Sequence, residues 1–379
     1  MKKNLHLYQS PFRSESRILR ETKTIVDSGF IDKVVIAAVW ENGLHLKEKL
    51  DDKRSVYRMR CWMTCLPSTR ISRMLILIEW AIRIPLKFFW QNFDVINCHS
   101  LFTLPIGVFF KLFSRAILIY DAHELETEMG HWPNWIKKFG KILERISIRF
   151  ADEIFVVSDS IAQWYQKEYS LRKIHVIKNF PLAPPGPIPS SNRLRKALSI
   201  DKNDLLFLFQ GGLTRERNIP LLLDVFSQSV REKQIVFMGF GPLENTVRDY
   251  SQRFKNIHFH PAVPVEQVLL YTSSADVGVS LTDASCLNHI YSLPNKVFEY
   301  ILAGVPILVS DFPEMGRLID DFQFGWKVAA EPTAVIQKIA EISRKGLQQK
   351  KINLLKCRKS FAWENEATKL LNVYSRLVA

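Results

Sequence analysis

Short apolar runs alternate with amphipathic stretches in both halves of this chain of 379 residues. The apolar runs are rich in β-branched and aromatic residues, as strands are, and the stretches between them repeat apolar positions at helical spacing. Such alternation is typical of parallel α/β domains. We therefore predict strands at Asn4–Tyr8, Val34–Val39, Asp94–Cys98, Ala116–Tyr120 and Glu153–Val157 in the first half, and at Leu205–Gln210, Gln234–Met238, Val277–Ser280 and Pro306–Val309 in the second.

A proline-rich segment separates the two halves. The run PLAPPGPIPSS, from Pro181 to Ser191, contains too many prolines to continue a helix or a sheet, so it should be extended and semi-rigid. A chain of this length is long enough for two domains that each bury a core. We predict an N-terminal domain at residues 1–180, a linker at 181–192 and a second domain at 193–362.

The composition is that of a folded chain, with 47% hydrophobic residues and a mean hydropathy of -0.04. The opening sequence MKKNLHLYQSPF has basic residues but no apolar run after them, so we expect no secretory signal. Five cysteines, with no paired spacing beyond Cys61 and Cys65, argue against a disulfide framework. A reducing cytoplasm is therefore the expected compartment.

The chain carries a net charge of +14, and its first 180 residues hold 28 Lys and Arg against 19 Asp and Glu, or +9. Such an excess implies an anionic partner. From Lys53 to Trp90, basic residues are interleaved with tryptophans and aliphatic residues, and the one acid is Glu79. This mixture suits an interfacial helix on an anionic membrane surface, and the apolar run Met74–Ile78 is too short to span a bilayer. The alternative is a core helix with a solvated basic face.

No motif for reading bases accompanies this charge, so nucleic acid is not an expected partner.

The stretch from Ser292 to Val309, SLPNKVFEYILAGVPILV, places a cation and a carboxylate on one short helix. Helical spacing puts Lys296, Glu299 and Tyr300 near one end of it. A cation at a helix start suits a diphosphate, and a carboxylate one turn on can accept both hydroxyls of a ribose. The alternative is an ordinary amphipathic helix that enters a buried strand. The residues available for the core are Val297, Ile301 and Leu302.

This segment resembles the donor-site signature of nucleotide-sugar glycosyltransferases with the GT-B fold, in particular retaining glycosyltransferase family 4 of the bacterial surface-glycan type. The resemblance implies two Rossmann-like parallel-sheet domains that face each other across a cleft. It also implies that Glu299 binds the donor ribose. The C-terminal stretch 363–379 resembles the helix that crosses back to the first domain in such enzymes. Neighbouring residues expected at the donor site are Tyr291, Leu293, Pro294 and Asn295.

Three further stretches of the second half resemble donor-site loops of the family. In the run from Gln210 to Asn218, Arg215 or Arg217 matches the basic pair that holds the donor diphosphate, and Gly212 stands where the family usually has arginine. The turn at Met238–Pro242 contains Gly239 and Gly241, and the segment His260–Pro264 resembles a loop whose backbone reads the base. The residue expected to contact the base is Val263.

The first half carries polar residues at the ends of apolar strands, where cleft residues of such folds lie. The group DAHE resembles the cleft histidine motif of the family, so we predict that His123 contacts the donor sugar or the acceptor hydroxyl. The flanking acids Asp121 and Glu124 are expected at the substrate as well. His99 is a further candidate, with packing as its alternative role. The loop after the first strand faces the acceptor in the family, and the residues expected there are Phe12 and Arg13.

Combined with the cysteine content and the basic aromatic region, the resemblance leads us to expect a cytoplasmic, peripherally membrane-bound hexosyltransferase of cell-surface polysaccharide or lipopolysaccharide assembly. It would move a sugar with retention from a UDP- or GDP-sugar to a glycan or lipid-linked glycan. Arg217, Arg215 and Lys296 would stabilise the leaving diphosphate, so neither a cofactor nor a metal is expected. Tyr291 replaces a glutamate that is common in the family and leaves the anomeric outcome open.

Two alternatives remain at this stage. A nucleotide-sugar epimerase could share the double α/β architecture, and it would act without an acceptor. A non-catalytic scaffold of a glycan-assembly complex would turn over no donor. A dinucleotide oxidoreductase is disfavoured, because no GxGxxG follows the first strand.

Overall fold

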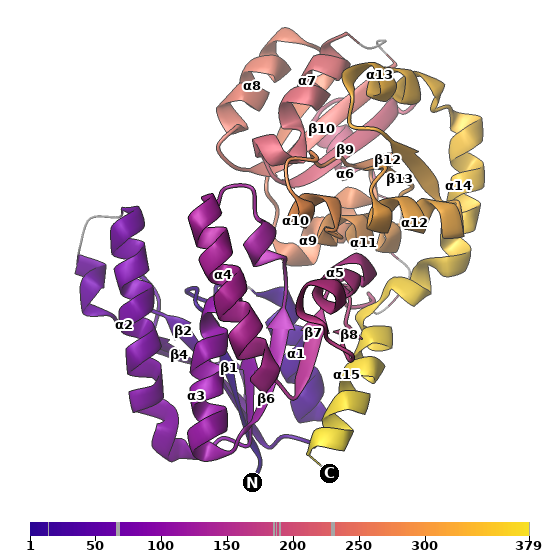
Figure 1. The fold of residues 1–379 in the computed structure, drawn as a ribbon. Coiled ribbons are helices and arrows are strands. Elements are labelled where there is room, and N and C mark those ends of the chain that lie inside the picture. The colour runs from indigo at the N-terminus through magenta and orange to yellow at the C-terminus, as the bar shows by residue number, and fades with distance from the viewer. Residues whose placement is uncertain are drawn as a thin grey trace. The chain divides into compact units, whose positions relative to one another are not determined.

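The computed structural model describes residues 1–13, 15–65, 69–184, 186, 188, 191–228 and 232–378. The chain divides into two units, each built on its own sheet (Figure 1). Unit 1 comprises Met1–Lys178 together with Glu366–Ala379, and unit 2 comprises Asn179–Asn365. The described residues of the proline-rich segment all fall within unit 2, and its residues Pro185, Pro187, Pro189 and Ser190 lie outside the described part of the chain.

Unit 1 is built on an eight-stranded sheet with the order β3-β4-β2-β1-β5-β6-β7-β8. All neighbouring strands are parallel except β3 and β4, which are antiparallel. The strands are β1 (Lys3–Leu7), β2 (Lys33–Val39), β3 (Lys47–Lys49), β4 (Arg54–Met59), β5 (Val95–Cys98), β6 (Ile117–Ala122), β7 (Glu153–Val156) and β8 (His175–Val176).

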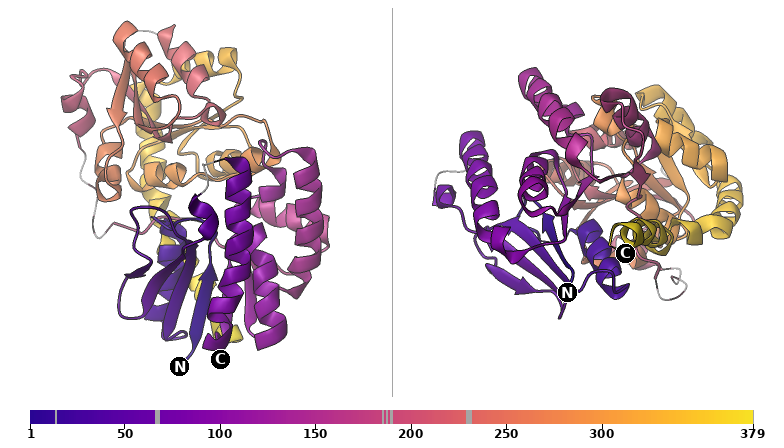
Figure 2. Two further views of the ribbon diagram at one scale, coloured as in Figure 1. Left: turned by 90° about the vertical axis from the view of Figure 1, so that its left-hand side faces the viewer. Right: turned by 60° about the horizontal axis from the view of Figure 1, so that its bottom comes forward.

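Helices cover both faces of this sheet, as parallel strands require because both their faces are apolar. Helices α2, α3 and α4 lie side by side on one face, and α1 lies on the other (Figures 1 and 2). The helices of unit 1 are α1 (Ser16–Asp27), α2 (Arg70–Phe88), α3 (Leu104–Ser114), α4 (Asn134–Ser147), α5 (Asp159–Tyr169) and most of α15 (Trp363–Leu377).

The C-terminal helix is anchored in unit 1 by a buried hydroxyl. Tyr374 on α15 donates a hydrogen bond to Asn97 (3.0 Å) and accepts one from Asn4 (3.1 Å). Both asparagines belong to strands at the centre of the sheet, and all three side chains are buried. These bonds satisfy polar groups that would otherwise destabilise the core.

Unit 2 contains a fully parallel six-stranded sheet with the order β11-β10-β9-β12-β13-β14. Its strands are β9 (Leu205–Gly212), β10 (Lys233–Phe240), β11 (Ile257–Pro261), β12 (Val277–Ser280), β13 (Ile307–Ser310) and β14 (Gly325–Val328). Its helices are α6 (Arg193–Ala197), α7 (Ile219–Ser227), α8 (Glu244–Arg253), α9 (Val265–Thr272), α10 (Leu287–Ile290), α11 (Asn295–Leu302), α12 (Pro313–Phe322), α13 (Pro332–Glu341) and α14 (Arg344–Cys357).

Side chains of β9 alternate between two hydrophobic cores, as the period of two in a strand requires. Leu206 and Leu208 join the core under α11 and α12, whereas Phe207 and Phe209 join the core under α7 and α13. Both faces of the strand are therefore buried, which explains its uninterrupted apolar sequence.

The predicted strands are all present, with ends that differ by at most two residues. Strands β3, β4, β8, β11 and β14 were not predicted. β4 pairs with β2 along the run RSVYRM, in which arginine and serine interrupt the apolar pattern. The prediction of one interfacial helix over Lys53–Trp90 is therefore wrong for Arg54–Met59. In this region, only α2 and the turn before it remain as candidates for contact with a membrane surface.

Two of the arginines counted in that basic region are buried instead. Arg54 and Arg58 lie on β4 and are 8% and 2% exposed. Arg58 donates to the carbonyl oxygens of Pro11 and Phe12, each at 2.7 Å, and so holds the loop after β1. No helix in the described part of the chain is long and apolar enough to cross a bilayer.

Candidate functional site

The predicted helix of the donor-site segment is α11, which begins at Asn295 and follows Pro294. Val297, Ile301 and Leu302 are buried, as predicted. Lys296 and Glu299 stand one turn apart and are half-buried. Tyr300 is fully buried. Its hydroxyl accepts a hydrogen bond from the backbone amide of Gln210 (3.0 Å) and donates one to the backbone carbonyl of Leu208 (2.9 Å). Tyr300 therefore fixes α11 against the end of β9.

Lys296 is held over an aromatic ring and close to a second cation. Its Nζ lies 3.6 Å from the centroid of the Phe209 ring, on β9. Burial lowers the pKa of Lys296 well below its usual range, the charge of Arg217 lowers it further, and Glu299 opposes both. A cation disfavoured in this way gains most from an anion bound beside it.

Glu299 is oriented by a residue that we did not predict. Gln210 donates its amide hydrogen to Glu299 and accepts a hydrogen bond from the Thr272 hydroxyl (2.7 Å). Gln210 is 3% exposed and ends the apolar part of β9. The signal was present in the sequence, because a polar residue at the end of an apolar strand is the pattern used above for Asp121.

Glycines at the ends of β9 and β10 keep this edge of the sheet free of side chains. A Cβ on Gly239 would lie 1.9 Å from the carbonyl oxygen of Gly211 on the neighbouring strand. Gly241 has φ +153° and would meet Leu213 in the same way. Gly212 is different, because the nearest side-chain atom to its Cβ position is 3.9 Å away. Gly212 is thus open to a ligand, whereas Gly239 and Gly241 are required by the backbone.

Arg215 and Arg217 lie on the short 3₁₀ helix Arg215–Arg217 directly after β9. Arg215 is exposed, and Arg217 is half-buried. Because Arg217 is the one whose charge acts on Lys296, it is the better placed of the two for an anion at α11.

The loop after β12 carries a second polar cluster. Asp283 accepts hydrogen bonds from Ser285 (2.6 Å) and His289 (2.7 Å). Burial opposes the ionisation of Asp283, but these bonds outweigh it and lower its pKa. The amide of Asp283 donates to the carbonyl of Glu216 (3.1 Å), which ties this loop to the one bearing Arg217. Tyr291 follows α10 and is half-buried. Leu293, just ahead of α11, is buried.

The predicted base-reading loop is shorter than expected. His260 and Pro261 belong to β11, where they pair with Met238 and Gly239, so the prediction of a loop over the whole of His260–Pro264 is wrong. Val263 lies beyond the strand and is half-buried, and its base contact stays a prediction.

In unit 1 the polar residues predicted at strand ends converge on one buried carboxylate. Asp121 accepts hydrogen bonds from His99 (3.0 Å), His123 (2.9 Å) and the guanidinium of Arg17 (2.7 Å). Burial opposes the ionisation of Asp121, but Arg17 and His123 outweigh it and hold its pKa well below the usual range. Asp121 is therefore an anion that orients three cationic or neutral donors.

His123 is the member of this cluster with an exposed surface. Its side chain is 24% exposed, whereas those of His99 and Asp121 are 0% exposed. Burial lowers the pKa of His99 to about 4, with Asp121 opposing it. His99 is thus neutral, and its Nε2 accepts from His6 at 2.8 Å. This geometry favours a positioning role for His99 and Asp121 and leaves a substrate contact to His123.

The remaining acceptor-side predictions occupy different surroundings. Phe12 is 3% exposed and has a left-handed φ of 54°, and its carbonyl oxygen accepts the hydrogen bond from Arg58, so its side chain is part of the core. Arg13 is exposed and pairs with Glu41 at 2.7 Å. Glu124 is exposed next to His123. The buried partners His6 and Arg17 were not predicted, because each lies in an apolar or helical pattern that gives no sign of its contact with Asp121.

Two family models match this chain. Residues 204–345 match the group 1 glycosyl transferases, and residues 32–180 match glycosyltransferase family 4. The two matches include all of the second sheet, all strands of the first sheet except β1, and the helix with Lys296 and Glu299. The chain belongs to this family of glycosyltransferases.

A curated relative of this glycosyltransferase is the chitobiosyldiphosphodolichol beta-mannosyltransferase of Eremothecium gossypii. The two are 24% identical over 259 residues, which cover 59% of this chain and 54% of the relative. The chain thus spans little more than half the length of the curated relatives it matches.

Solved glycosyltransferase structures share the fold at low sequence identity. Sucrose-phosphate synthase from Thermosynechococcus elongatus has a TM-score of 0.82 and 14% identity, and the match covers 100% of this chain and 99% of that one. Anabaena Alr3699/HepE in complex with UDP and glucose has a TM-score of 0.73 and 14% identity, with 99% and 100% covered. These similarities confirm the predicted GT-B fold.

The glycosyltransferase has one set of side chains that could hold a metal ion, within the residues described. Donor atoms of His99, Asp121 and His123 all lie within 4.8 Å of one another. Arg17 already donates to both oxygens of Asp121, and a cation would compete with it. The donor set therefore fits a hydrogen-bonded cluster better than a metal site, and the absence of a metal requirement stays a prediction.

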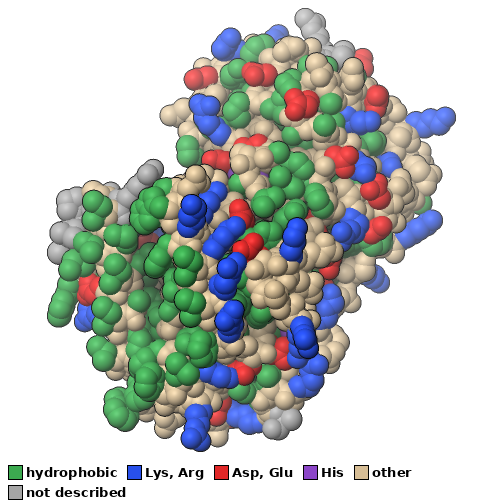
Figure 3. Space-filling view, viewed as in Figure 1, with side chains coloured by type: hydrophobic (Ala, Val, Ile, Leu, Met, Phe, Trp, Pro, Cys, Tyr) green, Lys and Arg blue, Asp and Glu red, His purple; other side chains and the backbone are tan. Residues whose placement is uncertain are grey.

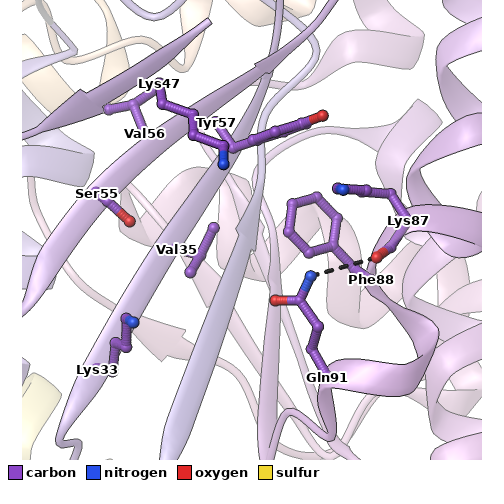
Figure 4. Close-up of a pocket in the computed structure, with 9 residues that line it drawn as sticks. All are labelled: Lys33, Val35, Lys47, Ser55, Val56, Tyr57, Lys87, Phe88 and Gln91. Atoms are coloured by element: carbon purple, nitrogen blue, oxygen red, sulfur yellow. Dashed lines mark hydrogen bonds between the residues drawn. The ribbon is translucent and has the colours of Figure 1, made fainter.

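A cavity of about 280 Å³ lies elsewhere in unit 1, between α2 and the strands β2 and β4 (Figure 4). Its wall includes Lys33, Lys47 and Lys87 around Tyr57 and Phe88. It contains none of the residues predicted for donor or acceptor, so it is separate from both clusters described above.

Proposed function

We propose that this glycosyltransferase transfers a hexose from a UDP- or GDP-sugar to a hydroxyl of a glycan or lipid-linked glycan acceptor, without a metal ion. The observation that carries the proposal is the pairing of Lys296 with Arg217 at the glycine-rich end of β9, one helical turn from Glu299. Two cations that repel each other there would be stabilised by a bound anion, and a carboxylate one turn on suits the ribose of the same ligand.

The diphosphate would bind where the backbone is open. Gly212 leaves room for a phosphate, and the amides of Asn295 and Lys296, at the first two positions of α11, have no acceptor within the helix. In the transition state the leaving diphosphate gains charge, and Arg217 and Lys296 would stabilise it more than they stabilise the bound donor. Arg215 would assist from the exposed side of the same 3₁₀ helix.

The acceptor hydroxyl would be received in unit 1 at His123. Asp121 holds the Nε2 of His123 at 2.9 Å, so the orientation of the imidazole is fixed before a substrate arrives. Glu124 and Arg13 are exposed and would contact the sugar, and Phe12 would position the loop that bears Arg13. His99 would act through Asp121.

Relatives support the classes of donor and acceptor. Alr3699/HepE has been solved with UDP and glucose, and the name of the Eremothecium gossypii enzyme gives a diphosphodolichol-linked acceptor. We propose a bacterial role in cell-surface polysaccharide or lipopolysaccharide assembly, at the cytoplasmic face of the cell membrane. Retention of anomeric configuration is part of the proposal, and NMR of the product would decide it.

The first test is a titration of the purified protein, without metal, against UDP-, GDP-, dTDP- and CMP-linked sugars, followed by thermal unfolding. A ligand at about 100 times its Kd adds about 2.7 kcal/mol to stability, so a melting shift is expected with one nucleotide class. Glu299→Ala should abolish the shift. Glu331→Ala, which removes an exposed carboxylate ahead of α13, should leave it intact.

Other outcomes would overturn the proposal. No shift with any nucleotide would favour a scaffold role. Conversion of the donor sugar into an epimer in the absence of acceptor would identify an epimerase instead.

A further inference from the structure

Helix α4 presents its apolar stripe to solvent and its polar residues to the core. Trp135, Phe139, Ile142 and Ile146 follow one another at helical spacing and are 68%, 55%, 59% and 58% exposed. The buried residues of the helix are Gly140, Glu144 and Ser147. An amphipathic helix of a globular protein normally does the reverse.

The inversion is held in place by a buried carboxylate. Glu144 accepts hydrogen bonds from the hydroxyls of Tyr120, Tyr165 and Tyr169, each at 2.6 Å. Glu144 is 1% exposed, so these three bonds satisfy a group that would be costly to bury alone. The core contacts of α4 thus include a polar cluster around Glu144 and the close packing of Gly140, and the exposed apolar stripe is available for another surface.

Helix α2 has an apolar stripe on its outer side as well. Trp80 anchors the helix, because its ring is buried and its indole N–H donates to the carbonyl of Ala38 (2.9 Å). On the opposite side of α2, side chains at helical spacing are each about half exposed or more. They are Ile71, Met74, Ile78, Ile82 and Leu86.

Aromatic contacts join α2 to α3 at the surface. The ring of Phe89, just after α2, lies 5.0 Å from that of Trp90 and 5.7 Å from that of Phe109 on α3. Phe109 in turn lies 4.8 Å from Phe113, which is 66% exposed. Figure 3 shows hydrophobic side chains gathered over α2, α3 and α4, with basic side chains beside them along α4.

The charged side chains of these three helices are mostly basic. They contain nine Lys and Arg and two acids, Glu79 and Glu144. Glu144 is buried, and Glu79 accepts from the amides of Trp62 and Met63 and pairs with Arg83 (2.8 Å). Lys111, Lys141 and Arg145 pair with acids of neighbouring segments, and Lys137 and Lys138 add further positive charge along α4. A surface that combines apolar stripes, tryptophans at its edge and more basic than acidic residues is complementary to anionic lipid.

We propose that the face formed by α2, α3 and α4 docks unit 1 onto an anionic phospholipid bilayer, with the stripe of α4 entering the interface. This inference rests on the proposed function in one respect. An enzyme that uses a lipid-linked acceptor would meet that acceptor at a membrane. A second copy of the chain is the competing occupant. It is disfavoured, because the basic flanks of two such faces would repel each other.

The test is flotation of the purified full-length chain with vesicles of phosphatidylcholine alone, or of phosphatidylcholine mixed with phosphatidylglycerol. We expect flotation with the mixed vesicles only, and its loss on adding salt. The double variant Phe139→Ser, Ile142→Ser should bind at least about tenfold more weakly, because two exposed apolar side chains that would be buried in the lipid interface are lost. The matched control is Ile352→Ser, Leu355→Ser, which removes two exposed apolar residues of α14 and should float as the wild type does.

A charge variant keeps the proposal testable if the stripe variant fails to fold. Lys138→Glu, Arg149→Glu reverses two exposed basic residues beside the stripe and should also weaken flotation at least about tenfold. Lys345→Glu, Lys356→Glu on α14 makes the same change of net charge and should have little effect.

The results that would overturn the proposal are specific. Absence of flotation with anionic vesicles, or unchanged flotation of folded stripe and charge variants, would do so. A dimer in sedimentation analysis that the stripe variant dissociates, without lipid binding, would assign the face to a second copy. Failure of the proposed function is a separate result, because nucleotide titration reports on unit 2 and flotation is measured without any donor.

Discussion

The Nζ of Lys296 lies 3.6 Å from the centroid of the Phe209 ring. The two residues come from different elements of unit 2, α11 and β9, and neither sequence motif predicts the contact. Burial and the charge of Arg217 disfavour the ammonium form of Lys296, whereas the face of an aromatic ring attracts it. Phe209 therefore stabilises the ammonium form of Lys296, which burial and Arg217 disfavour.

Replacing Phe209 by leucine should weaken nucleotide binding more than it destabilises the fold. The change removes the aromatic face and keeps most of the apolar volume. We therefore expect about fivefold weaker nucleotide binding and a decrease of less than about 1.5 kcal/mol in the free energy of unfolding. Phe207→Leu is the matched control, because Phe207 is buried on the same face of β9 and contacts Phe226 instead. Calorimetric titration with the preferred nucleotide is the measurement, and equal effects of both variants would argue against the contact.

Nucleotide binding should take up a proton. The pKa of Lys296 is lowered in the free protein, and a diphosphate beside it favours the ammonium form and raises that pKa. Affinity should consequently fall as pH rises through the free-state pKa. Calorimetry in buffers of different ionisation enthalpy measures the uptake directly. Lys296→Arg, which stays charged, should show neither uptake nor this pH dependence, and a wild type without uptake would contradict the assignment.

Arg217→Ala should reduce kcat/KM by an amount equivalent to about 2.7–4 kcal/mol, as the loss of one preorganised donor to a developing charge does. Arg215→Ala should cost less, because Arg215 is exposed and its interactions are screened by solvent. Rates of donor consumption in the presence of acceptor test both variants. Equal losses, or a larger loss for Arg215→Ala, would reverse the assignment.

Two glycine substitutions should separate folding from binding. In Gly239→Ala the new methyl group would meet the carbonyl of Gly211, so we expect a loss of stability of unit 2. In Gly212→Ala the methyl group meets nothing closer than 3.9 Å, so the variant should fold normally and bind nucleotide more weakly. Thermal unfolding and titration of each variant give the answer, and normal nucleotide binding by Gly212→Ala would remove Gly212 from the site.

Unit 1 should lose stability in mild acid because of His99. Its pKa is lowered from 6.5 to about 4 by burial, so below pH 6.5 the unfolded chain binds a proton that the folded unit does not. The stability that neutral His99 provides is complete above pH 6.5 and falls by about 3 kcal/mol as pH drops to about 4. Hydrogen exchange of the amides of β5 and β6 measures this loss. We expect His99→Asn to make the profile shallower but not flat, because burial also lowers the pKa of the neighbouring His6. His131→Asn, at an exposed position, should leave the profile unchanged.

The alternation of apolar runs and amphipathic stretches was sufficient to predict the class of fold and the central strands. Val277–Ser280 is found at its predicted bounds, because a strand buried on both faces is continuously apolar. Strand β14 at a sheet edge and β4, one strand in from an edge, were missed, because polar residues such as Arg54, Arg58 and Lys327 break their apolar pattern. The side chains of α11 that enter the core could likewise be predicted from helical spacing.

The partners of the functional side chains depend on contacts between residues distant in the sequence. Asp121 lies in a strand and Arg17 in a helix more than a hundred residues earlier, and only the packing of α1 onto the sheet joins them. The sequence by itself determined which residues are polar at strand ends and which helix carries a cation and a carboxylate. Tertiary structure decided that Gln210 orients Glu299, that Phe209 supports Lys296 and that α4 turns its apolar stripe outward. Those outcomes depend on which hydrogen-bonding and charged groups become partners inside the fold, and the periodicity of apolar residues along a chain does not specify these partners.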